Sequence, residues 1–191
     1  MTAETLTNTD PAAQALTGDY DVDPAHSRIG FAAKHAMVTT VRGGFKDFTA
    51  QAHLDEDDVA NSSVQVEIRT ASIDTGNAQR DEHLRTGDFL EVEAYPTITF
   101  HSTRVEQTGD DTYAVTGDLT IKDVTKPVTV TFEKTGAAQD PWGGFRVGFE
   151  GKTVINRKEW GVNWNVALEA GGILVSDKVT LEFDIAAVRR A

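Results

Sequence analysis

The 191-residue sequence contains no cysteine, so the chain can form no disulfide, carries no thiolate nucleophile and offers no cysteine ligand for zinc. Basic residues are also scarce: 18 lysines and arginines stand against 30 aspartates and glutamates, which gives a formal net charge of −12. A chain this acidic is a poor partner for the phosphate backbone of nucleic acids and for anionic membrane surfaces. We therefore expect no nucleic-acid partner.

Long hydrophobic runs are missing as well. Residues 1–18 contain neither a basic segment nor a continuous apolar stretch, so we expect no secretory signal peptide, no stable membrane insertion and a cytoplasmic protein. We predict that residues 1–18 form a polar, flexible tail. Residues 19–191 are within the size of one domain, and a hydrophobic content of 39% is enough to bury its core.

Signatures of metal binding and catalysis are lacking too. The five histidines have no spacing of the HExxH kind, and the acidic run 55–58 lacks the glycine and alternating ligands of a calcium loop, so we interpret the run as a solvated turn. The triplet Asp74-Thr75-Gly76 matches that of aspartic proteases, but a single copy before a helix favours a turn. We predict no metal, no cofactor and no catalytic residue.

What the sequence does contain is an alternation of apolar and polar residues with a period of two, which predicts β-strands with one buried face. Besides six clearly alternating segments, two strands are expected near 27–33 and 45–54, so about eight strands would form an antiparallel sandwich or barrel. Gly117 interrupts one alternating face and predicts a bulge or bend. The clearest alternating segments are 64–68, 97–101, 113–121, 128–133, 145–149 and 179–185.

Residues 72–96 break the alternation. Charged residues at helical spacing, with Asn77 as N-cap and Gly87 at the end, predict a short helix. A second helical turn is expected to begin at Thr86, before Pro96 forces an extended backbone. We expect this segment to lie across one end of the sheet or barrel.

The inward-facing positions are occupied by valine, isoleucine, leucine, phenylalanine and tyrosine, which allows two kinds of interior. One is an ordinary packed core, which the periodicity alone favours. The other is a dry cavity for an apolar ligand. Burying a hydrocarbon chain is worth about 0.8 kcal/mol per methylene, so a long apolar tail could bind there with few polar contacts.

Motifs in order along nearly the whole chain, roughly residues 17–188, resemble the YceI-like family. They include Asp23-Pro24-Ala25-His26-Ser27, Gly43-Gly44-Phe45, Arg80-Asp81-Glu82-His83-Leu84, Phe100-His101-Ser102, Gly117-Asp118-Leu119-Thr120-Ile121, Arg157-Lys158-Glu159-Trp160-Gly161 and Asp177-Lys178-Val179. The resemblance implies an elongated, lipocalin-like, eight-stranded antiparallel barrel with one or two short helices, whose interior holds the tail of an isoprenoid or similar amphiphile. It also suggests a homodimer. Two departures are visible: Asp123 stands where the family usually has a turn glycine, and we expect no secretory signal, although one is common in the family.

Two groups of residues follow as candidate ligand contacts. The predicted cavity wall comprises Phe31, Phe45, Ile68, Phe89, Phe100, Leu119, Phe132, Phe149, Trp164 and Leu181. The predicted head-group contacts at the mouth are Arg80, Asp81, His83 and Arg157, whose side chains suit a phosphate or quinone oxygen. Two of these head-group residues have a structural alternative. Asp81 could bind loop amides or Arg85 and pin the helix, and Arg157 could stack on Trp160 and lock a loop.

We therefore predict a non-enzymatic carrier that holds an isoprenoid lipid or other long-chain amphiphile, such as a polyprenyl phosphate or an isoprenoid quinone, inside a barrel. Two alternatives stay open. One is an enzyme that acts on such a lipid, and the other is an interaction protein whose barrel is filled with side chains and binds no ligand.

Overall fold

The structure, a computed structural model, describes residues 15–191, so the predicted tail of residues 1–18 lies for the most part outside the described residues. The strands are β1 Gly18–Val22, β2 Arg28–His35, β3 Thr39–Phe45, β4 Phe48–Leu54, β5 Ser63–Arg69, β6 Ile73–Asp74, β7 Thr97–Gln107, β8 Thr112–Ile121, β9 Val124–Gln139, β10 Phe145–Asn156 and β11 Val175–Arg189. The helix is α1 Ala78–Leu84, and the 3-10 turns are η2 Pro24–His26, η3 Val59–Asn61, η4 Thr70–Ser72 and η5 Arg157–Trp160.

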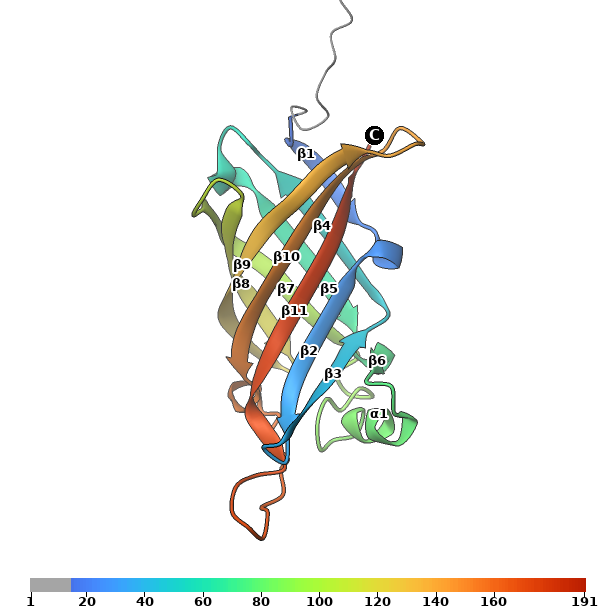
Figure 1. Cartoon of the computed structure of the whole chain (residues 1–191), viewed down its shortest axis with the longest axis vertical. Helices are drawn as coiled ribbons and strands as arrows, with labels where there is room; N and C mark the ends of the chain where they lie inside the picture. The colour runs from blue at the N-terminus through green and yellow to red at the C-terminus, as the bar shows by residue number, and fades with distance from the viewer. Residues whose placement is uncertain (1–14) are drawn as a thin grey trace, which may run out of the picture.

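These strands form one antiparallel sheet that closes into a barrel (Figure 1). The ring runs β1-β4-β5-β7-β8-β9-β10-β11 and closes where β11 pairs with β1. The other three strands are continuations of ring strands, each separated from its ring strand by a short break. β2 comes directly after β1, β3 comes directly before β4, and β6 comes after β5; β3 pairs with both β2 and β6. The barrel therefore has eight strands, which confirms the predicted fold class and decides between sandwich and barrel. Closure leaves the ring without a free edge.

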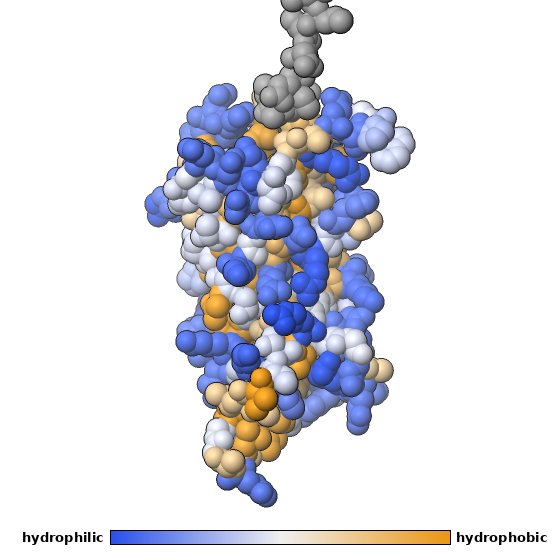
Figure 2. Space-filling model, viewed as in Figure 1, coloured by the Kyte–Doolittle hydropathy of each residue, from blue (hydrophilic) through white to orange (hydrophobic). Residues whose placement is uncertain are grey.

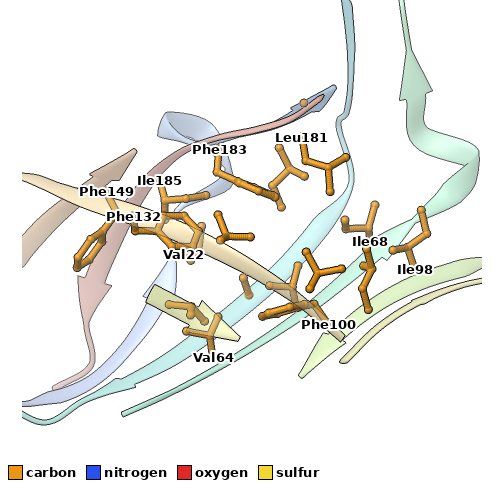
Figure 3. Close-up of a pocket in the computed structure, with 18 of the residues that line it drawn as sticks. Val22, Val64, Ile68, Ile98, Phe100, Phe132, Phe149, Leu181, Phe183 and Ile185 are labelled. Atoms are coloured by element: carbon orange, nitrogen blue, oxygen red, sulfur yellow. The ribbon is translucent and has the colours of Figure 1, made fainter. Parts of the chain in front are cut away.

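The alternation of residues explains the two faces of the wall. In β5, Val64, Val66 and Ile68 line the interior, as Figure 3 shows for Val64 and Ile68, while Gln65 and Glu67 are exposed. The irregularity predicted at Gly117 lies in the partner strand β7, whose register shifts between Ser102 and Arg104 opposite it. A Cβ atom on Gly117 would lie 2.5 Å from the Phe100 ring, so the glycine leaves room for that ring inside the barrel.

One end of the barrel carries the segment 72–96, as predicted (Figure 1). The Asn77 side chain caps α1 by accepting a hydrogen bond from the backbone N–H of Arg80 at 2.9 Å. The helix ends at Leu84 rather than at Gly87, and residues 86–95 form turns instead of a second helix. In the β8–β9 turn, Lys122 adopts the left-handed backbone, with φ 56°, while Asp123, which replaces the usual turn glycine of the family, does not.

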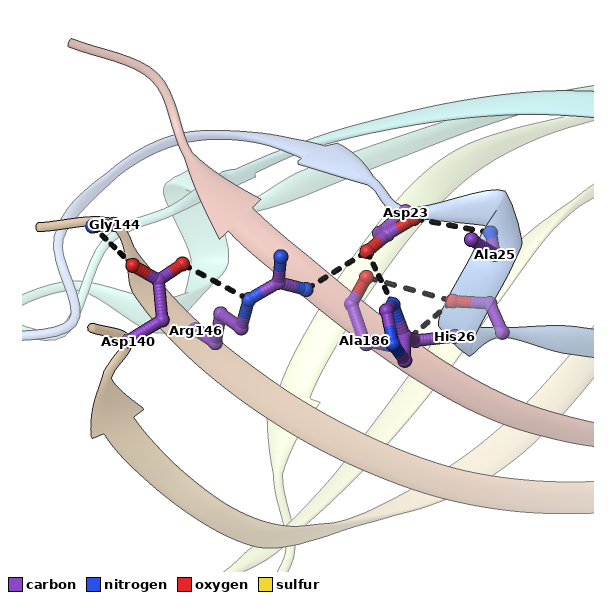
Figure 4. A network of polar contacts seen from close by, with 8 residues as sticks. Asp23, Ala25, His26, Asp140, Gly144, Arg146 and Ala186 are labelled. Atoms are coloured by element: carbon purple, nitrogen blue, oxygen red, sulfur yellow. Dashed lines mark hydrogen bonds and ion pairs between the residues drawn. The ribbon is translucent and has the colours of Figure 1, made fainter. Parts of the chain in front are cut away.

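An ionic network holds the break between β1 and β2 against the barrel wall (Figure 4). Asp23 accepts a hydrogen bond from Arg146 at 2.8 Å, lies 2.7 Å from Nδ1 of His26, and accepts one from the Ala25 backbone N–H. Arg146 also donates to Asp140 at 3.1 Å. The three contacts of Asp23, above all the hydrogen bond from Arg146, lower the pKa of Asp23 from 3.8 to about 2.

This network predicts a pH dependence of stability. Because the pKa of Asp23 is lower in the folded protein, its contribution to stability is present above about pH 4 and is lost as the pH falls towards 2. Thermal melts across this range should show a steeper loss for the wild type than for Asp23→Asn, which has no carboxylate to protonate there. Parallel melting curves for the two proteins would contradict the assignment.

Candidate ligand-binding cavity

A cavity of about 570 Å³ lies inside the barrel, within the range of small-molecule binding sites. Every strand of the ring contributes to its lining, which consists mainly of valine, isoleucine, leucine and phenylalanine. Figure 3 shows Val22, Val64, Phe100, Phe132, Phe183 and Ile185 directed toward the same interior space. The interior is therefore apolar over most of its length.

The large inward side chains do not fill this space. Phe100, Phe132 and Phe183 pack against the buried core but stay only partly buried, although they point into the barrel. The rings of Phe132 and Phe183 pack at a centroid distance of 5.7 Å and leave their other faces to the cavity. An apolar surface left without contacts loses dispersion energy, and a guest of matching chemistry would restore it.

Nine of the ten predicted wall residues line the cavity, and Trp164 does not. The lining residues are Phe31, Phe45, Ile68, Phe89, Phe100, Leu119, Phe132, Phe149 and Leu181. Trp164 packs behind the wall, with its ring 5.3 Å from that of Phe89 and 4.8 Å from that of His83. Sequence reasoning missed Leu84, Leu90 and Val162, which come from loops and a helix end where no period marks the inward side.

Polar groups on the lining are confined to the two ends of the cavity. Arg157 lies at the end that carries α1. At the opposite end the lining includes Asp55, Glu56, Ser62, Gln107, Asp110 and Lys134. The ammonium of Lys134 lies 3.1 Å from Asp111, and its inward position continues the alternation of β9 through Val130 and Phe132. That alternation is the sequence signal that could have identified Lys134.

Arg157 is buried, with 6% of its surface exposed. Its guanidinium donates hydrogen bonds to the backbone carbonyls of Val162 at 2.6 Å, Ser176 at 2.9 Å and Val175 at 3.2 Å. Burial lowers the pKa of Arg157 from its usual value. The arginine thus locks a loop, as the structural alternative proposed, but through carbonyls, while the Trp160 indole donates to the Leu119 carbonyl at 3.0 Å.

The other three predicted head-group residues lie outside the cavity lining. Arg80 donates to the hydroxyl and the carbonyl of Thr75, at 2.7 and 2.8 Å. The buried carboxylate of Asp81 accepts from the backbone N–H and the hydroxyl of Thr75, and so pins α1 to the preceding turn. Nε2 of His83 lies 2.8 Å from Asp88. Head-group binding by these residues stays a prediction, which this geometry does not favour because the polar groups already have partners.

The Asp74-Thr75-Gly76 triplet forms a turn, with the Asp74 carboxylate accepting from the Gly76 backbone N–H at 2.7 Å. Within residues 15–191, no group of three or more histidine, aspartate or glutamate side chains is placed to hold a metal ion. In the same range, no helix has the length and apolar character needed to cross a membrane.

Comparison with known sequences identifies a family and several relatives of this chain. A model of the YceI-like domain matches residues 20–187. A UPF0312 protein of Pseudomonas aeruginosa is 43% identical over 157 residues, which are 81% of this chain and 82% of that protein. A UPF0312 protein of Azotobacter vinelandii is 41% identical over 153 residues, which cover 79% of this chain and 80% of that protein.

Solved structures share the fold. Burkholderia cenocepacia BcnA superposes with a TM-score of 0.76 at 29% identity and covers 86% of this chain and 98% of its own. The Campylobacter jejuni YCEI protein gives a TM-score of 0.71 at 26% identity, with full coverage of both chains. A polyisoprenoid binding domain from Saccharophagus degradans has the same fold, with a TM-score of 0.65 at 14% identity over 90% of this chain and 98% of that chain.

Proposed function

Because this chain belongs to the YceI-like domain family, we propose that it is a non-enzymatic binding protein that holds the apolar tail of a lipid amphiphile inside its barrel. The observation that carries the proposal is the cavity of about 570 Å³ with its partly exposed apolar lining. The fold shared with a polyisoprenoid binding domain supports an isoprenoid tail. A packed interaction protein would have no such space.

Binding would be driven by removal of the tail from water. Ten buried methylene equivalents would contribute about 8 kcal/mol, which corresponds to micromolar affinity without any polar contact. The cavity would discriminate between ligands by the length and width of the apolar tail more than by its chemistry, because the middle section of the cavity offers few polar groups. An isoprenoid quinone and a polyprenyl phosphate would therefore share the tail site and differ at the head group.

Arg157 is the residue that we propose for the head group. It is the one predicted head-group residue on the cavity lining, and three of the five N–H donors of its guanidinium are used by loop carbonyls. The remaining donors can serve a quinone or phosphate oxygen. Contacts from Arg80, Asp81 or His83 would first require α1 and its preceding turn to give up their internal hydrogen bonds.

The arrangement of titratable groups supports binding without catalysis. Ionisable side chains of the lining lie at the two ends, where Lys134 and Asp55 are in contact with their own neighbours. An enzyme that acts on the lipid would need a base or nucleophile within hydrogen-bond reach of a reacting atom. Loss of lipid turnover with retained binding in a variant of an end residue would favour the enzyme instead.

The test is native mass spectrometry of the purified protein, followed by extraction and mass analysis of the released molecule. We expect one amphiphile per chain, and the same spectrum measures the predicted homodimer. A protein that is isolated empty, and that gains no thermal stability from polyprenyl phosphates, isoprenoid quinones or fatty amides, would overturn the proposal.

A further inference from the structure

Apolar side chains are exposed together at the end of the barrel that carries α1. They belong to the β2–β3 turn, residues 36–38, and to residues 161–174, which we call the apolar tip. Met37 is 64% exposed, Val38 77% and Val166 46%. Figure 2 shows a hydrophobic patch at this end of the molecule, on the part that extends beyond the barrel in Figure 1.

The two segments of the apolar tip form one surface. The backbone N–H of Ala36 donates to the Leu174 carbonyl at 2.7 Å, and His35 pairs with Val175 in the sheet. A Cβ atom on Gly172 would lie 3.6 Å from Cγ of Met37, so the turn and the loop are in van der Waals range of each other. The exposed methionine and valines therefore belong to one continuous surface at this end of the barrel.

The turn itself is an unfavourable place for these residues. Val38 donates its backbone N–H to the His35 carbonyl at 3.0 Å, and both central residues have positive φ, 51° for Ala36 and 62° for Met37. Turns with two left-handed residues favour Asn-Gly, because other L-residues are strained there. Alanine and methionine at an exposed turn of this kind serve neither backbone stability nor solubility, which indicates a functional reason for an apolar side chain.

Charge distinguishes the apolar tip from its surroundings. Beside the tip, Lys34, Arg157, Lys158 and Lys178 stand against Glu159, Glu169 and Asp177, so the tip itself is close to neutral, whereas the segment 72–96 at the same end has six acidic and two basic residues. The opposite end carries the acidic residues Asp55, Glu56, Asp57, Asp58, Asp110, Asp111 and Asp140, of which Asp111 pairs with Lys134 and Asp140 with Arg146. In a chain with a net charge of −12, the apolar tip is thus the surface at the barrel ends that an anionic lipid surface would repel least.

The apolar tip is continuous with the ligand cavity. Val162 and Val175, at the two ends of the loop, line the cavity, and Trp164 packs against the lining residue Phe89. The same loop is held by the hydrogen bonds of Arg157. The outer surface of this loop is therefore the exposed apolar patch, and its base is part of the cavity wall.

We propose that the apolar tip docks reversibly into the surface of a lipid bilayer, where the protein takes up or delivers its ligand. This inference rests on the proposed function, because a ligand with a long apolar tail resides in membranes and exchanges slowly through water. Exposed methionine and valine side chains on a neutral rim gain by burial at the acyl boundary. Docking is driven by this burial and not by charge.

The test is flotation of the purified protein with phosphatidylcholine vesicles, with and without phosphatidylglycerol. We expect the wild type to float with both and to gain nothing from the anionic lipid. A variant with Ala36→Asn, Met37→Gly and Val38→Ser should partition at least tenfold more weakly. Its thermal stability should equal or exceed that of the wild type, because Asn-Gly relieves the strained turn.

The matched control is Trp142→Gln, which removes an 87% exposed apolar side chain at the opposite end and should leave flotation unchanged. Equal losses in both variants, no flotation of the wild type, or binding that requires phosphatidylglycerol would each overturn the inference. A change of sedimentation mass in the tip variant would assign the patch to contact with a second copy and also overturn it. Native mass spectrometry separates the two proposals, because a lipid-loaded protein that does not float leaves the proposed function standing.

Discussion

Replacing Val66 with tryptophan should weaken binding of a long-chain ligand roughly 200-fold, because the indole would displace about four methylene equivalents worth about 3 kcal/mol. Val66 lies in β5 and lines the cavity, with Ala50 and Phe100 as its partners in the neighbouring strands. The affinity of wild type and variant for one identified lipid, measured by calorimetry or by ligand-induced thermal shift, tests the expectation.

The control for this substitution is Val154→Trp on β10, where the side chain is 58% exposed on the outer face of the barrel. It should bind ligand like the wild type. The empty Val66→Trp protein should melt at or above the wild-type temperature, because it fills space instead of creating it. Unchanged affinity in Val66→Trp would place the ligand outside the barrel.

The strands were predictable because each has one buried and one solvated face, so a period of two survives in segments such as 64–68 and 113–121. Closure was not predictable from that period. It depends on the pairing of β1 with β11, which are separated by most of the chain, and the resemblance to a known family supplied it. Whether inward side chains meet at the centre depends on strand number and tilt, which alternation does not encode.

The residues of the candidate site were likewise more predictable on the strands than on the loops. Phe100 and Phe132 were assigned to the wall because they lie at inward positions of strands. Trp164 was misplaced because its loop has no period to mark a face. Arg80 and His83 resemble ligand contacts in the sequence, but each finds a partner within a few residues, and short-range hydrogen bonds of this kind leave no pattern that distinguishes them from free donors.

Arg157→Gln should reduce the free energy of unfolding by roughly 3 kcal/mol, because one buried and two partly buried carbonyls lose their hydrogen-bond donors while one desolvated charge is relieved. For a chain of this size, that loss lowers the melting temperature by about 6–12 °C. The affected carbonyls belong to Val162, Val175 and Ser176, which fix both ends of the loop in the apolar tip. Urea unfolding and thermal melts of the empty protein measure the effect.

The neighbouring substitution Lys158→Gln isolates this effect from a simple loss of charge. Lys158 is exposed and pairs with Asp177 at 3.2 Å, and a surface ion pair of this kind contributes less than about 1 kcal/mol. Equal destabilisation by the two substitutions would contradict the role of Arg157 in holding the loop. If the Arg157 guanidinium also binds the head group, an added isoprenoid lipid should raise the melting temperature of Arg157→Gln less than that of Lys158→Gln. An equal rise would confine Arg157 to the loop and leave the head group to other residues at the cavity ends.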